Sequence, residues 1–249
     1  MIELRLPALV AAIAVSASMA AGAATPVEEI SPYVYPRNAA AKAPGIGQML
    51  DADTYLTLSD DGKTIERRDV KSGKVTGTLV DFASTRETVI ESAEGFELSP
   101  DGSKVLIWRD VRPIYRHSFT ASYYVYELRS KLLRPLSAKF SQQRRPVFAP
   151  NSRVIAFVGP DNNIYMKKLD YNTEVAVTDD GAVNSVINGV PDWTYEEEFT
   201  TDCSMAFSPD SETFCFLRYD EREVPMYTLP VYEGACDPQK EYALYPGEY

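Results

Sequence analysis

The sequence is poor in the residues that most often carry catalysis and bind metal ions. Among 249 residues it has one histidine, His117, and three cysteines, Cys203, Cys215 and Cys236. The cysteine spacing matches no zinc-binding pattern, and no metal site or cofactor is expected. No G-x-S-x-G turn, phosphate-binding glycine loop or H-E-x-x-H motif is present. A Ser-His-Asp triad would have to use His117, which lies on an apparent strand and favours a structural role, so no catalytic residue is expected in this chain.

The three cysteines predict no secure disulfide. An odd count leaves at least one thiol without a partner in the chain. Cys215 lies in the apolar run Phe214–Leu217 and is predicted to be buried, as free cysteines often are. A bridge between Cys203 and Cys215 stays open as an alternative.

Basic residues are also few: 25 Lys and Arg against 36 Asp and Glu give a net charge of −11. Nucleic acids and anionic lipid surfaces both attract basic proteins, so neither is an expected partner. No segment after residue 24 is apolar and long enough to span a bilayer. The composition is that of a soluble protein without a membrane span.

The first residues have the features of an export signal. Leu6–Ala24 is apolar and made largely of small residues, Arg5 precedes it, and Ala21–Ala23 resembles a cleavage site. A membrane anchor is the competing interpretation, but the stretch is short and rich in Ala and Ser. We therefore expect a signal peptide over residues 1–23, a mature chain over 24–249, and a periplasmic or secreted protein.

A repeated pattern indicates the fold. One pattern recurs at Phe96–Ile107, Val147–Phe157 and Met205–Phe214. It consists of a hydrophobic residue, Ser or Ala, Pro, Asp or Asn, and then an apolar strand. Tyr55–Lys63 is a weaker copy without the proline. Pro-Asp-Gly and its variants form tight turns, and strand pairs recurring every 40–60 residues are typical of propeller blades.

The blade count suggests an incomplete domain. Prolines 100, 150 and 209 are 50 and 59 residues apart, so the mature chain holds about four to five blades at roughly 50 residues each. The expected fold class is all-β, with an incomplete β-propeller. The chain ends at Tyr249, directly after a turn signal, which favours the N-terminal piece of a longer protein.

One acidic stretch, Asp192–Phe199, contains three consecutive glutamates, Glu196, Glu197 and Glu198, behind two aromatic residues. Adjacent negative charges are unfavourable unless a nearby cation compensates them. On a helical turn, side chains about 100° apart can converge on one point, where two carboxylates would hold an ammonium group. Taken locally, a solvated acidic turn is the simpler alternative.

Arg116 is a candidate partner for these carboxylates. On a strand it would point opposite to His117 and could face the propeller centre. Its planar fork of donors suits a carboxylate or a peptide carbonyl, although a purely structural ion pair to a glutamate is also open.

The run Asn188–Phe199 closely resembles the double-glutamate motif of the dipeptidyl peptidase IV family, which are serine exopeptidases related to prolyl oligopeptidase. Arg116–Tyr123 resembles the family's arginine-containing strand, and Arg218–Pro225 the segment after the next blade turn. The resemblance extends from about Ile30 to the C-terminus. It implies an eight-bladed propeller followed by an α/β-hydrolase domain that this chain does not contain.

The resemblance also implies residue roles. Glu197 and Glu198 would bind the substrate's N-terminal ammonium, and Arg116 a peptide carbonyl. Trp193 and Tyr195 would pack to fix the turn, and Glu196 would not touch the substrate. The expected function is the anchoring of peptides with a free N-terminus for release of X-Pro or X-Ala dipeptides, with this chain alone inactive. Homodimers of the full-length protein are expected, as in many family members.

Three alternatives stay open. The chain could belong to a non-catalytic binding propeller of the periplasm or to a pseudoenzyme that retains the anchor. A relative of the acylaminoacyl or prolyl endopeptidases would share the architecture, but those enzymes lack the double glutamate. The sequence downstream of Tyr249 discriminates among these.

Overall fold

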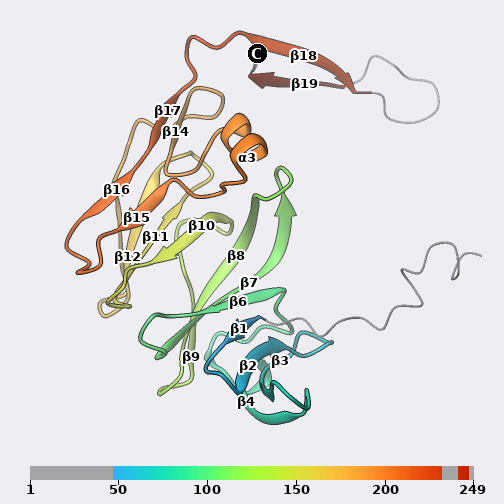
Figure 1. Ribbon diagram of the computed structural model, residues 1–249. Helices are drawn as coiled ribbons and strands as arrows, with labels where there is room; N and C mark the ends of the chain where they lie inside the picture. Colours follow the sequence, from blue (N-terminus) through green and yellow to red (C-terminus); the bar gives the residue numbers. More distant parts are fainter. Residues whose placement is uncertain (1–46, 232–240, 247–249) are drawn as a thin grey trace, which may run out of the picture. The chain divides into compact units, whose positions relative to one another are not determined.

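The computed structural model describes residues 47–231 and 241–246, and these are mostly β-strand (Figure 1). Within them, one α-helix, α3 (Trp193–Phe199), and one 3-10 helix, η2 (Phe82–Ser84), interrupt the strands. None of the described helices is long and apolar enough to cross a membrane. The predicted signal peptide and Cys236 lie outside the described residues.

Three antiparallel meanders of four strands follow one another along the chain, which we call blades 1, 2 and 3. Blade 1 comprises β1 (Gln48–Met49), β2 (Thr54–Leu58), β3 (Thr64–Asp69) and β4 (Val75–Asp81). Blade 2 comprises β6 (Gly95–Leu98), β7 (Lys104–Pro113), β8 (Phe119–Glu127) and β9 (Leu132–Pro135). Blade 3 comprises β10 (Gln143–Phe148), β11 (Val154–Val158), β12 (Ile164–Lys168) and β13 (Thr173–Ala176). Consecutive four-stranded meanders are propeller blades, so the predicted fold class is confirmed.

Shorter strand pairs complete the described part. Blades 2 and 3 are joined where β8 pairs with β10, and β5 (Arg86–Glu87) adds to β9 in parallel. The remaining strands are β14 (Val186–Asn188), β15 (Met205–Phe207), β16 (Phe214–Phe216), β17 (Arg218–Asp220), β18 (Met226–Val231) and β19 (Glu241–Pro246). They pair as β15 with β16, β14 with β17 and β18 with β19. The last predicted repeat thus supplies the hairpin β15–β16.

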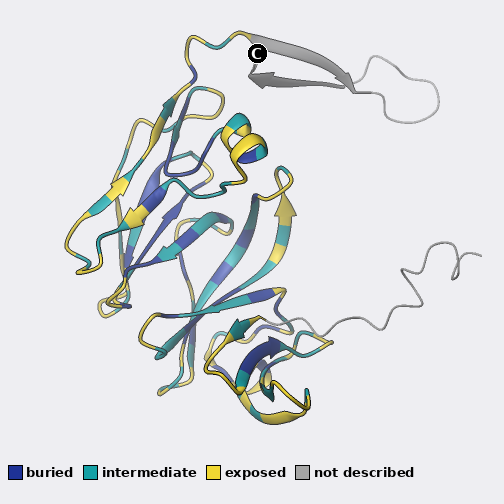
Figure 2. Cartoon of the chain, in the orientation of Figure 1, coloured by how far each residue is buried: buried dark blue, intermediate teal, exposed yellow. Residues whose placement is uncertain are grey.

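The apolar cores lie between successive blades, because successive side chains on a strand point to opposite faces. In β7, Val105 and Ile107 pack in the cluster shared with blade 1, whereas Leu106 packs in the cluster shared with blade 3. In β11, Phe157 faces blade 2 and Val158 faces the segment that contains β15. Blades 2 and 3 are therefore buried on both faces, which explains the uninterrupted apolar runs in strands such as β7 and β11. Buried positions concentrate in strands such as β2 and β11 (Figure 2).

The repeated turns are built alike, with a residue in the left-handed region at the same place in each. Glycines occupy this place in blades 1 and 2, Gly62 and Gly102, both with φ 69°. Serines occupy it in the next two turns, Ser152 with φ 57° and Ser211 with φ 64°. Each serine side chain accepts a hydrogen bond from the preceding turn: Asp101 N–H to Ser152 Oγ and Asn151 N–H to Ser211 Oγ, both 3.0 Å. These serines link neighbouring blade turns.

The predicted burial of Cys215 is wrong, because this residue is exposed. Cys215 and Cys203 are both free thiols, so the alternative of a bridge between them does not hold. Cys215 lies on β16 between Phe214 and Phe216, whose rings pack against the cluster shared with blade 3. Because side chains alternate along a strand, the cysteine between them faces the other way.

Candidate functional site

Helix α3 contains the three glutamates, as expected for a helical turn. The helix begins after Asp192, whose carboxylate accepts the N–H of Tyr195 at 2.9 Å, an N-cap contact. It ends at Thr200, which adopts the left-handed conformation with φ 56°. The helix is thus only seven residues long, and its two ends fix which way each glutamate points.

Glu196 is fully buried, and it holds the helix against the loop between β7 and β8, residues 114–118. Its Oε1 accepts two backbone hydrogen bonds, from His117 N–H at 2.9 Å and from Ser118 N–H at 2.7 Å. Hydrogen bonds to a charged acceptor are about twice as strong as neutral ones. The first of the three glutamates therefore positions the loop that contains Arg116.

The other oxygen of Glu196 faces Arg144 of β10. Glu196 Oε2 lies 3.8 Å from Arg144 Nη2, close enough for an ion pair but too far for a hydrogen bond. Burial lowers the pKa of the Arg144 guanidinium, and the Glu196 carboxylate opposes that shift. Arginine nevertheless stays charged, so the pair compensates two charges taken out of water.

Glu197 and Glu198 are less buried, and they differ in their partners. Glu197 Oε2 lies 3.1 Å from Arg116 Nη2, with 12% of the Glu197 side chain and 72% of the Arg116 side chain exposed. Glu198 is exposed and makes no ion pair within the part of the chain that the structure describes. Three carboxylates thus face two guanidinium groups, and Glu198 is left uncompensated.

Arg116 and His117 do not lie on a strand, which corrects the sequence interpretation. They belong to the loop 114–118, which Ile114 N–H closes by donating to Ser118 O at 2.9 Å. Neighbouring amides of a strand point in opposite directions, whereas the amides of His117 and Ser118 both reach Glu196 Oε1. A strand would not present these two adjacent N–H groups to one oxygen, whereas the loop does.

The two aromatic residues of the acidic stretch remain substantially exposed. Tyr195 is 45% exposed, and its ring centre lies 5.3 Å from that of Phe199 and 5.5 Å from that of Tyr219. Trp193, at the start of the helix, is 43% exposed. Tyr195 thus packs on one side of the helix, and Trp193 presents much of its ring to solvent.

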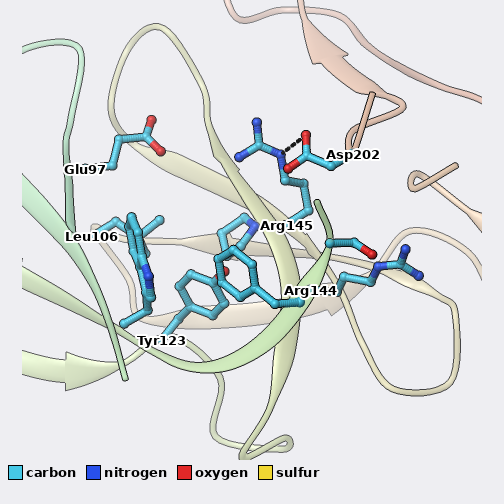
Figure 3. Close-up of a pocket in the computed structure, with 10 residues that line it drawn as sticks. Glu97, Leu106, Tyr123, Arg144, Arg145 and Asp202 are labelled. Atoms are coloured by element: carbon cyan, nitrogen blue, oxygen red, sulfur yellow. Dashed lines mark ion pairs between the residues drawn. The ribbon is translucent and has the colours of Figure 1, made fainter. Parts of the chain in front are cut away.

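A second charged contact holds the segment after the helix. Arg145 Nε lies 3.1 Å from Asp202 Oδ1 (Figure 3). Arg145 lies at a bulge in β10, where the pairing register with β11 shifts and its φ is 47°, and bulges commonly re-aim a side chain. Sequence reasoning did not select Arg144, Arg145 or Asp202. Two adjacent arginines at the start of an otherwise apolar strand were the available signal.

Buried antiparallel blades with an acidic helix tied to a neighbouring blade define a β-propeller protein with a charged site. The chain belongs to the dipeptidyl peptidase IV (DPP IV) N-terminal region family, whose model matches residues 99–247. This matched range contains the arginine loop, α3 and the three repeated turns at Pro100, Pro150 and Pro209.

Similar proteins agree with this assignment. The chain is 34% identical over 205 residues to a probable dipeptidyl-aminopeptidase B of Ajellomyces dermatitidis, covering 80% of this chain and 21% of the relative. It is 33% identical over 183 residues to a probable dipeptidyl peptidase 4 of Aspergillus fumigatus, covering 72% of this chain and 23% of the relative. The crystal structure of Porphyromonas gingivalis dipeptidyl peptidase 4 superposes with a TM-score of 0.77 at 38% identity, covering 89% of this chain and 31% of that one. The chain spans about a fifth of the length of these curated relatives.

Proposed function

We propose that this chain is the substrate-anchoring propeller portion of an exported serine-type dipeptidyl peptidase. The full-length protein would release X-Pro or X-Ala dipeptides from peptides with a free N-terminus, and this chain alone would be inactive. The observation that carries the proposal is the uncompensated Glu198 next to the Glu197–Arg116 ion pair.

The chemistry of a peptide N-terminus fits this arrangement. An α-amino group has a pKa of about 8 and is mostly charged near neutrality. Glu198 has no ion-pair partner among the described residues, and Glu197 has a second carboxylate oxygen beyond the one that faces Arg116. An ammonium held between them would balance the local charge.

Arg116 completes the anchor. Its guanidinium has five N–H donors, and 72% of the side chain is exposed, so donors remain available for a peptide carbonyl. Glu196 supports this arrangement indirectly, because it binds the loop that carries Arg116. Holding the amino end at a fixed distance from a nucleophile would place cleavage after the second residue, a contribution of positioning rather than of bond breaking.

The test uses the full-length gene product and a Gly-Pro chromogenic amide. Glu198→Gln removes the uncompensated charge while keeping the side-chain size, and we expect kcat/KM to fall about 100-fold, as when one partner of a desolvated charge pair is lost. Glu91→Gln, an exposed glutamate before β6, serves as the matched control and should keep its rate.

An N-acetylated version of the same substrate identifies the partner of the carboxylate. The unmodified enzyme should discriminate strongly against it, and the Glu198→Gln variant should lose most of that discrimination. Unchanged turnover in the variant would refute the anchoring role. If the unmodified protein binds the free peptide without releasing any dipeptide, the binding-propeller alternative holds instead.

A further inference from the structure

A small cavity of about 150 Å³ lies next to the site, between blade 2, β10 and the segment after α3 (Figure 3). Aromatic rings line it on one side: Trp108, Phe119 and Tyr123. Charged side chains line the other, and the principal ones are Glu97, Arg145 and Asp202. The predicted roles of the acidic stretch do not use this cavity.

The charges around the cavity do not balance. Asp202 is paired with Arg145, and Arg144, which also lines the cavity, faces Glu196. The Glu97 carboxylate makes no hydrogen bond or ion pair to any residue in the described part of the chain, although the Glu97 backbone pairs with β7. Burial raises the pKa of the Glu97 carboxyl, and the positive charge of Arg145 opposes that shift only in part. The carboxylates here are three, those of Glu97, Glu196 and Asp202, and the guanidinium groups are two, those of Arg144 and Arg145. The excess negative charge leaves a place for one cation.

The aromatic side of the cavity suits a cation. The ring centres of Trp108 and Tyr123 are 5.9 Å apart, and those of Trp108 and Phe119 are 6.4 Å apart. The faces of such rings attract ammonium and guanidinium groups, and tryptophan does so best. Rings together with an unpaired carboxylate favour an organic cation over a bare metal ion, which would require more oxygen ligands.

A buried polar group also lacks its partner here. Ser118 is 5% exposed and lines the cavity, and its Oγ has no hydrogen-bond partner among the described residues. Buried hydroxyl groups are normally satisfied. A ligand with N–H donors would provide one, because the Ser118 oxygen can accept.

We propose that the cavity binds the guanidinium or ammonium end of a basic side chain, with Glu97 as its counter-ion. Cavities of about 150 Å³ hold a benzene-sized molecule, so the end of an Arg or Lys side chain fits. The backbone N–H of Ser118 donates to Glu196 of helix α3, so the cavity and the glutamate helix share one residue. The assignment of the cation to a bound peptide, at its first residue, rests on the proposed function, whereas the cation site itself does not.

Tryptophan fluorescence can report on this cavity directly. The chain has two tryptophans, so a Trp193→Phe background leaves Trp108 as the reporter. We expect n-propylguanidinium, at concentrations far below those that unfold proteins, to change the Trp108 emission with a saturable curve. Neutral propylurea, which has nearly the same shape, should bind at least about tenfold more weakly because it lacks the charge.

Three variants in this background decide the assignment. Glu97→Gln should weaken propylguanidinium binding at least about tenfold, and Glu91→Gln should leave it unchanged. Asp202→Asn removes the ion-pair partner of Arg145, so the positive charge of Arg145 is no longer compensated next to Glu97. Propylguanidinium binding should therefore weaken, which gives an independent variant if Glu97→Gln unfolds. Equal responses to the two probes, or unchanged binding in both cavity variants, would overturn the proposal.

The peptide assignment has its own measurement in the full-length protein. The ratio of kcat/KM for Lys-Pro over norleucine-Pro chromogenic amides should fall severalfold in Glu97→Gln. If the ratio stays constant while propylguanidinium binding is lost, the cavity binds a cation other than the first side chain of the substrate. The binding assay needs no turnover, so failure of the proposed peptidase function would not affect it.

Discussion

The interiors of the blades and the surroundings of helix α3 differ in the kind of side chain they bury and in how fully the buried polar atoms are hydrogen-bonded. The clusters between blades consist of apolar residues, and they cover both faces of blades 2 and 3. Buried polar atoms without a hydrogen bond, within the described residues, occur instead mostly around the helix and the cavity. They belong to Ser118, Gln142, Arg144, Arg145, Asn188 and Glu196.

The two regions therefore contribute to the molecule in different ways. Buried polar groups are normally hydrogen-bonded, and each exception calls for an explanation. The blades provide apolar packing, and the region around α3 concentrates the buried charged and polar groups.

Removing a large side chain from the interior of a blade should have the largest effect on stability. Phe157 is fully buried, and its ring stacks on Tyr165 with centres 5.7 Å apart. Phe157→Ala removes this packing and leaves a cavity, so the free energy of unfolding should fall by about 4 kcal/mol. Urea denaturation followed by circular dichroism measures it. Tyr171→Ala, at a side chain that is 74% exposed, should lie within about 0.5 kcal/mol of the unmodified protein.

Breaking the Glu196 contact should cost less stability but affect the site as well. Glu196→Ala leaves the N–H groups of His117 and Ser118 without their acceptor and Arg144 without its counter-charge. We expect a loss of about 3 kcal/mol in urea denaturation, in the range for breaking a buried charge pair. The amide of Glu196→Gln can still accept from the loop, so that variant should lose less. A cost near zero for Glu196→Ala would mean that the loop does not depend on this carboxylate.

The smallest expected effect is the pH dependence that Glu97 contributes to stability. Burial raises the pKa of Glu97 above its ordinary value of 4.5. The folded protein then holds this proton to higher pH than the unfolded chain does, so its contribution to stability falls as pH rises through that window. Relative to Glu97→Gln, the unmodified protein should lose stability as pH rises above 4.5. A difference that stays constant in urea titrations across this range would contradict the burial of a charge at Glu97.

Local patterns in the sequence were sufficient for the blades, and they allowed a helical turn at the glutamates without requiring one. The turn residues of each repeat and the helical presentation of the glutamates depend on neighbours only a few residues apart. The backbone of Arg116 was not predictable in this way, because its loop is held by Glu196, 79 residues from His117. No local pattern distinguishes a glutamate that binds distant amides from one that faces solvent.

The same reason explains why the cavity was not found from the sequence. Glu97, Arg145 and Asp202 come from separate parts of the chain, and each is an ordinary charged residue in its local context. Cys215 is the opposite case. Strand alternation, a local rule, predicts its outward direction once Phe214 and Phe216 are assigned to the core.

The serines in the repeated turns bear on how cooperatively the blades unfold. Ser152 and Ser211 adopt a backbone conformation that glycine would adopt more easily, yet each side chain accepts an N–H from the turn of the neighbouring blade. In repeat architectures, such nearest-neighbour links make the units melt together rather than one by one. Glycine at these places would ease the local backbone and at the same time loosen one blade from the next.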